Sequence, residues 1–150
     1  MGAAIALQIA HRSDYAPLVA GLVLDSPVLN WVEVIKANCQ RAGFPRSAGL
    51  LAVPWLTNRA LARRLGLPSR ISFSESDWIA RADELSVPTL ILHGAKDDSV
   101  PIKTSSALAQ KRPDLVQLET FDAGHTLAWN SDATRWKETV TAWFKSDSNE

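Results

Sequence analysis

The sequence predicts an α/β fold, in which a mostly parallel sheet is flanked by helices. The segments "LVAGLVLDSP" (18–27) and "PTLILHG" (88–94) are nearly unbroken apolar runs. Such runs are typical of strands that are buried on both faces of a parallel sheet. The second half of the chain then alternates between strand patterns and helix patterns, which indicates that successive strands are parallel and joined by helices.

The first predicted element is a helix over residues 2–11. Only Gln8 interrupts its small and apolar residues between Ala3 and Ala10. A helix that is apolar on nearly all sides is expected to be buried. The strand predicted within residues 18–27 follows it.

The stretch after this first strand is too long for a plain crossover or loop. Helical patterns over residues 31–42 and 48–65 are interrupted by prolines. We therefore expect a helical cap over residues 29–76, inserted over one edge of the sheet. A further helix over residues 77–85 is expected to lead into the second strand.

The remaining elements alternate. Residues 115–125 form a third apolar run, but its apolar and polar residues alternate, which favours a half-exposed strand near an edge of the sheet. Helices are predicted over residues 101–111 and 132–145, the first opening with a proline suited to a first helical turn. The tail at 147–150 is expected to be frayed.

Composition excludes several classes of protein. The 150 residues correspond to one domain by length, and 16 basic residues balance 16 acidic ones, so the overall charge points neither to nucleic acid nor to an anionic membrane. No apolar run reaches the roughly 18 residues of a membrane span. The single cysteine, Cys39, excludes a disulfide framework and a cysteine metal cluster and suits a cytoplasmic protein. Cys39 itself is expected to be buried and inert.

Two loops carry the residues suited to catalysis. Each follows a predicted strand, and they read "LHGAKDDSVP" (92–101) and "FDAGHTLAW" (121–129). Ligands of open α/β sheets bind at the carboxyl ends of the strands, so Asp97 and His125 should emerge at the same edge. A carboxylate and an imidazole in this order match the Asp…His part of a Ser–His–Asp triad in which the serine comes first.

These loops resemble motifs of the α/β-hydrolase superfamily. "HGAKDDSVP" resembles the superfamily signature H-G-x-x-D-x-x-V-P, and "AGHTLAW" resembles its final G-H turn. The resemblance implies that Asp97 is the catalytic acid and His125 the catalytic base of a serine hydrolase. It implies neither a metal nor a cofactor. An ester is the favoured substrate because esterases are frequent in the superfamily, with a peptidase of the same superfamily as the alternative.

The opening "MGAAIALQIA" resembles the residues that follow the serine of the nucleophile elbow, G-x-S-x-G. Gly2 would then be the last glycine of the elbow, and the nucleophile would precede Met1. The backbone N–H of Met1 would be one donor of the oxyanion hole. Either the chain is a fragment of a longer protein or its start lies at an internal methionine.

The resemblance divides the partial hydrolase domain (1–150) into four parts. Residues 1–28 form the helix and strand after the elbow, and residues 29–76 form the cap. Residues 77–146 contain the last core strands and helices with the two loops, and residues 147–150 form the tail. A chain of this kind leaves a sheet edge and an apolar helix uncovered, so self-association or pairing with a complementary N-terminal chain is expected. A truncated, inactive interaction module is the remaining alternative to a hydrolase of small ester or amide substrates.

Other residues have competing interpretations. Asp98 and Asp25 are the alternative acids, His93 is expected to hold the loop of Asp97, and His11 to end a helix near the surface. Ser26, Ser105 and Ser106 are poor nucleophile candidates because glycines do not flank them. Trp31 and Trp55 are expected either to pack in the core or to line an acyl pocket. Trp129 is expected to brace the loop that carries His125.

Overall fold

A parallel sheet forms the centre of the protein. The computed structural model describes residues 2–147. Within these residues the sheet has three strands, β1 (Leu22–Asp25), β2 (Thr89–Gly94) and β3 (Val116–Phe121), in the order β1-β2-β3. Both pairings are parallel, and the sheet confirms the predicted α/β class.

The burial of the strands follows their position in the sheet. Every residue of the central strand β2 is buried. Strand β3 at the edge is buried only at its two end residues, Val116 and Phe121, so it is half-exposed as predicted, but buried and exposed positions do not strictly alternate along it. Ile91 packs into one core cluster with Leu7 and Leu108, and its neighbours Leu90 and Leu92 pack into a second cluster. The sheet therefore has a hydrophobic core on each face.

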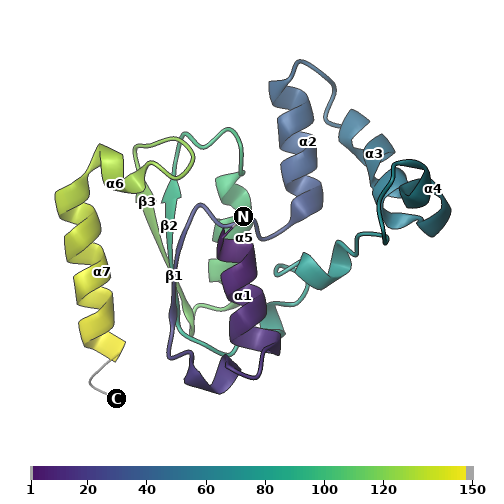
Figure 1. The fold of residues 1–150 in the computed structure, drawn as a ribbon. Coiled ribbons are helices and arrows are strands. Elements are labelled where there is room, and N and C mark those ends of the chain that lie inside the picture. Colours follow the sequence, from purple (N-terminus) through teal and green to yellow (C-terminus); the bar gives the residue numbers. More distant parts are fainter. Residues whose placement is uncertain (1, 148–150) are drawn as a thin grey trace.

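Helices cover both faces (Figure 1). Helices α1 (Gly2–Arg12) and α5 (Ile102–Lys111) lie on one side of the sheet, and α7 (Ala133–Asp147) lies on the other. The short helix α6 (Ala128–Ser131) joins β3 to α7. Within residues 2–147, no helix has the length and apolar character that crossing a bilayer requires.

The segment between β1 and β2 contains helices α2 (Trp31–Arg41), α3 (Ala48–Thr57) and α4 (Arg59–Arg64). Asn30 begins α2 by accepting a hydrogen bond from the backbone N–H of Glu33 at 3.0 Å. The helix predicted over 48–65 is divided at Asn58, whose extended backbone ends α3. The Asn58 side chain accepts hydrogen bonds from the first N–H groups of α4. Short 3₁₀ turns occupy Ala16–Leu18, Ser74–Ser76 and Ala82–Glu84.

Two expectations about helices are wrong. Residues 77–85 form turns and the 3₁₀ segment Ala82–Glu84 rather than a helix, because Asp77 Oδ1 accepts the N–H groups of Ile79 and Ala80 and favours a turn. Helix α1 is also less buried than its composition indicates: Leu7 and Ala10 are buried, but Ile5 is 54% exposed.

Candidate active site

The two predicted loops meet at the carboxyl ends of β2 and β3. Asp97 lies three residues after β2, and His125 lies four residues after β3. His125 Nδ1 lies 2.8 Å from Asp97 Oδ2. A carboxylate can only accept a hydrogen bond, so Nδ1 carries the proton and Nε2 remains available as a base.

The Asp97 carboxylate is held by its own loop. Its side chain is fully buried, and Oδ1 accepts hydrogen bonds from the backbone N–H groups of Ser99 at 2.9 Å and Val100 at 2.8 Å. Burial alone would raise the pKa of Asp97. The three hydrogen bonds to the carboxylate outweigh burial and hold the pKa below its ordinary value, so Asp97 is charged at neutral pH.

The buried side chain of His93 is hydrogen-bonded to the same loop. His93 is fully buried, and its Nε2–H donates to the carbonyl of Val100 at 3.0 Å. Its Nδ1 accepts a hydrogen bond from Ser105 Oγ at 2.8 Å. Burial lowers the pKa of His93, so the ring is neutral and its tautomer is fixed by these two partners. His93 Nε2 also lies 3.4 Å from Asp97 Oδ2. This arrangement agrees with the expectation that His93 holds the loop that carries Asp97.

The histidine loop rests on the end of β2. A Cβ atom placed on Gly94 would lie 2.4 Å from the carbonyl oxygens of both Ala123 and Gly124. Only glycine permits this approach of the two backbones. Gly94 therefore allows the loop that carries His125 to pack directly on the end of β2.

Two residues with left-handed backbones join β1 to the same loop. Ser26 has φ 47° and Thr126 has φ 55°. Positive φ is unusual for serine and a strained conformation for a β-branched threonine. The backbone N–H of Thr126 donates to Ser26 Oγ at 3.2 Å, and Ser26 is nearly fully buried. The sequence does not signal this contact, because it joins residues 100 positions apart.

The alternative acids lie elsewhere. Asp98 is exposed, and its Oδ1 lies 3.6 Å from Arg41 Nη1. Asp25 ends β1, and its buried Oδ1 has no hydrogen-bond partner among the described residues. Burial raises the pKa of Asp25, despite a hydrogen bond with Ser26 that lowers it. The structure therefore pairs His125 with Asp97, and not with Asp25 or Asp98.

Helix α2 is hydrogen-bonded to the loop that carries Asp97. Asn38 Nδ2 donates to the carbonyl of Ser99 at 2.9 Å, and Arg41 Nη1 donates to Ser99 Oγ at 3.1 Å. The backbone N–H of Ser99 in turn donates to Asp97. Sequence reasoning missed Asn38 and Arg41, since nothing in a helical pattern indicates which loop a side chain will reach.

The candidate serines have other partners. Ser26 accepts from Thr126 and Ser105 donates to His93. Among residues 2–147, no serine hydroxyl is hydrogen-bonded to His125. Met1, which was expected to supply an oxyanion-hole N–H, lies outside the described residues.

Comparison with known proteins identifies the family of the chain. Residues 53–150 match the family model of the prolyl oligopeptidase family, Peptidase_S9. The chain belongs to this family. Among proteins with curated functions, none matches the sequence.

Solved structures show the same fold as this prolyl oligopeptidase family member. The esterase Pf2001 of Pyrococcus furiosus has a TM-score of 0.65 and 17% identity, over 97% of this chain and 50% of the esterase. A thermophilic esterase from Thermogutta terrifontis has a TM-score of 0.57 and 20% identity, over 97% and 62% of the two chains. MenH from S. aureus has a TM-score of 0.55 and 19% identity, over 97% and 65%. The fold is that of the α/β-hydrolase superfamily, and the chain spans about half the length of the Pyrococcus furiosus esterase.

Aromatic residues and Cys39 take less central positions in this family member. Trp129 lies in α6, just after the loop that carries His125. It is 44% exposed and packs edge-to-face on Trp136 of α7. Trp55 is also exposed, so the core position considered for it is wrong. Cys39 is half-buried rather than buried. His11 ends α1 beside Glu84, as expected.

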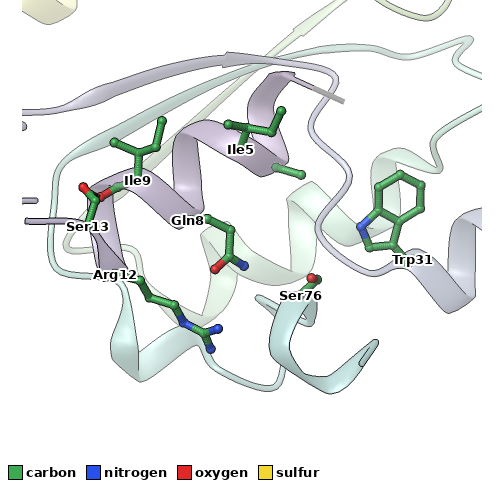
Figure 2. A pocket seen from close by; sticks show the side chains of 8 residues that line it. Ile5, Gln8, Ile9, Arg12, Ser13, Trp31 and Ser76 are labelled. Atoms are coloured by element: carbon green, nitrogen blue, oxygen red, sulfur yellow. Dashed lines mark hydrogen bonds between the residues drawn. The ribbon is translucent and has the colours of Figure 1, made fainter. Parts of the chain in front are cut away.

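A groove of about 510 Å³ runs along α1 and not over the Asp97–His125 pair. Figure 2 shows Ile5 and Ile9 of α1 on one side of it and Trp31, at the start of α2, on the other. Trp31 thus faces α1 across the groove. Within residues 2–147, no group of three or more His, Cys, Asp or Glu side chains is placed to hold a metal ion.

Proposed function

We propose that the chain supplies the acid and base of a serine hydrolase that transfers an acyl group to water. The observation that supports this best is the 2.8 Å hydrogen bond from His125 Nδ1 to the buried Asp97 carboxylate. It occurs at the carboxyl ends of adjacent parallel strands, where ligands of such sheets bind. The side chain of His125 is 36% exposed, so its free nitrogen can reach a substrate.

In the proposed reaction, a serine hydroxyl attacks the carbonyl carbon of the substrate and His125 Nε2 takes its proton. The charged imidazolium is stabilised by Asp97, which keeps Nδ1–H in place. His125 then returns the proton to the leaving alcohol as the acyl-enzyme forms. In the second half, His125 takes a proton from water, the resulting hydroxide attacks the acyl-enzyme, and the proton goes back to the serine.

We propose that the nucleophile precedes Met1 in the sequence of the whole protein. Support comes from the partners of Ser26 and Ser105, which face Thr126 and His93 rather than His125. The resemblance of Gly2 to the last glycine of an elbow agrees with this position.

Labelling with a fluorophosphonate tests the proposed reaction. The gene is extended upstream through an in-frame Gly-x-Ser, and the extended protein is compared with the 150-residue chain. We expect labelling and ester hydrolysis by the extended protein only, and loss of both in its His125→Ala variant. His11→Ala is the matched control, since His11 lies at the end of α1. An extended protein that is neither labelled nor active, or labelling that survives His125→Ala, would contradict the proposal and favour an inactive interaction module.

For the substrate we propose a small ester. Esterases among the similar folds support this choice. A peptidase is the second candidate, and the match to the prolyl oligopeptidase family favours it. The ratio of kcat/KM for a p-nitrophenyl ester to that for a peptidyl p-nitroanilide distinguishes the two. A higher kcat/KM for the anilide would favour the peptidase.

We also propose that the α1 side of the chain pairs with a second copy or with a complementary N-terminal chain. Among the described residues β1 pairs only with β2, and Ile5 and Ile9 of α1 are exposed beside it. Sedimentation should detect self-association of the 150-residue chain, and a monomer at all concentrations would contradict the self-association.

A further inference from the structure

The charges of this electrically balanced chain are segregated. Residues 34–74 contain seven of the sixteen basic residues and none of the sixteen acidic ones. The rest of the chain therefore carries an equal excess of negative charge. Balance over the whole sequence hides a strongly basic segment that comprises most of α2, all of α3 and α4, and the loops around them.

Large apolar side chains are exposed on the same segment. On α3, Leu50 is 47%, Leu51 74% and Trp55 43% exposed. Leu51 and Trp55 are four residues apart, so they lie on one face of the helix. In Figure 1, α3 and α4 lie on the far side of α2 from the sheet, at the outermost end of the molecule. The hydrophobic core of the sheet does not cover this face.

The arginines next to these side chains are exposed. Arg59, Arg63 and Arg64 are exposed on α4, directly after α3. Within residues 2–147 none of the three makes a hydrogen bond or an ion pair with another side chain. This contrasts with Arg46, which is bound to Glu33 at 3.1 Å. We call the three arginines together with Leu50, Leu51 and Trp55 the α3–α4 surface.

We infer that the α3–α4 surface docks onto an anionic lipid membrane. Exposed leucine and tryptophan can enter the boundary between headgroups and acyl chains, and adjacent arginines can bind anionic headgroups. Nucleic acid would satisfy the arginines but would offer no apolar phase to Leu50 and Leu51. The negative charge of the remaining chain would be repelled by the same membrane, so it favours one orientation with α3 and α4 facing the lipid. This docking does not depend on the hydrolase chemistry.

Cosedimentation with lipid vesicles tests this inference on the 150-residue chain. We expect binding to vesicles of phosphatidylcholine with about 30% phosphatidylserine, and much weaker binding to phosphatidylcholine alone. Replacing Arg59, Arg63 and Arg64 by Gln should weaken binding on the order of a hundredfold, at about fivefold for each charge. The matched control replaces Arg12, Arg135 and Lys137 by Gln, which changes the net charge equally but lies outside residues 34–74.

A second pair of variants tests the apolar contact. Leu51→Ser should weaken binding about fivefold, because the leucine then no longer enters the lipid. Leu18→Ser is its control, since Leu18 is 79% exposed but lies outside the α3–α4 surface. Circular dichroism checks that each variant is folded. The emission of Trp55, taken as the difference from Trp55→Phe, should shift to shorter wavelength on binding.

Several results would overturn the inference. These are equal binding to both kinds of vesicle, no binding to either, or equal losses in the arginine variant and its control. Tighter binding to a single-stranded oligonucleotide than to the anionic vesicles would assign the surface to nucleic acid. Loss of self-association in Leu51→Ser without a change in vesicle binding would assign it to a second copy of the chain.

Discussion

Gly94 connects the end of β2 to the loop that carries His125, and we expect Gly94→Ala to separate them. An added Cβ would lie 2.4 Å from two carbonyl oxygens and 2.8 Å from the carbonyl carbon of Ala123. Cβ atoms do not approach other heavy atoms below about 3.0 Å, and backbone atoms cannot rotate away as a side chain can. The histidine loop must therefore move away from the sheet.

The expected cost follows from this overlap. Overpacking a core costs about 1–3 kcal/mol, and a clash with backbone belongs at the upper end, so we expect a loss of about 3 kcal/mol in the free energy of unfolding. At roughly 2–4 °C per kcal/mol, Tm should fall by about 6–12 °C. Since the loop carries His125, the hydrogen bond to Asp97 should lengthen or break as well.

Thermal melting followed by circular dichroism measures the change, with Gly124→Ala as the control. A Cβ on Gly124 would meet only Leu127 Cδ1 at 3.6 Å, an ordinary contact, so this neighbouring variant should melt within about 2 °C of the wild type. Equal melting of Gly94→Ala and the wild type would refute the close approach, as would an equal loss in both variants.

Three further predictions concern stability, measured by urea unfolding. Ser26→Ala should cost about 1–2 kcal/mol, because the backbone N–H of Thr126 loses its hydrogen-bond acceptor. Ser26→Gly should cost less, because glycine adopts the positive φ without strain. A larger loss for Ser26→Gly than for Ser26→Ala would contradict this. Asp25→Asn should stabilise the protein by about 1 kcal/mol at pH 7, because burial raises the pKa of Asp25. The folded wild type loses stability as pH rises above 3.8 and through that raised pKa, since the buried carboxylate then becomes charged. The advantage of the variant should therefore vanish near pH 3. Hydrogen bonds from Lys103 and Lys36 lower the pKa of Glu33 from 4.5 to about 2, so its contribution to stability is complete above pH 4.5 and is lost as pH falls through 2. After allowance for solvent screening, Glu33→Gln should cost about 1 kcal/mol at pH 7 and clearly less at pH 2, and a loss that is undiminished at pH 2 would contradict this reason.

The elements that sequence predicted well are those with a local signal. Apolar runs identified β1 and β2, alternation identified β3 as the more exposed strand, and the two loop motifs identified a pair of residues that the structure brings to hydrogen-bonding distance. A strand end places its loop at a known edge of the sheet, so Asp97 and His125 could be expected together without knowledge of the remaining packing.

What sequence could not predict depends on which side chains bond to the nearby backbone and on which distant segments pack together. Asn58 caps the start of α4 and so divides the helix predicted over 48–65, and the Asp77 side chain replaces a predicted helix by turns. The exposure of Ile5 depends on what packs against α1, which helical periodicity does not reveal. The same holds for the Asn38 contact with Ser99, 61 residues away.

The tautomer of His125 tests the central claim, that Asp97 orients this imidazole as a base, most directly. Nitrogen-15 NMR at about pH 9, where an imidazole is ordinarily neutral, distinguishes a protonated Nδ1 from a protonated Nε2. In the wild type we expect the proton on Nδ1. In Asp97→Asn the amide oxygen must still accept from Ser99 and Val100, which turns the amide NH₂ toward His125 and should move the proton to Nε2. Asp98→Asn should keep it on Nδ1, and a tautomer that stays the same in Asp97→Asn or changes in Asp98→Asn would contradict the claim.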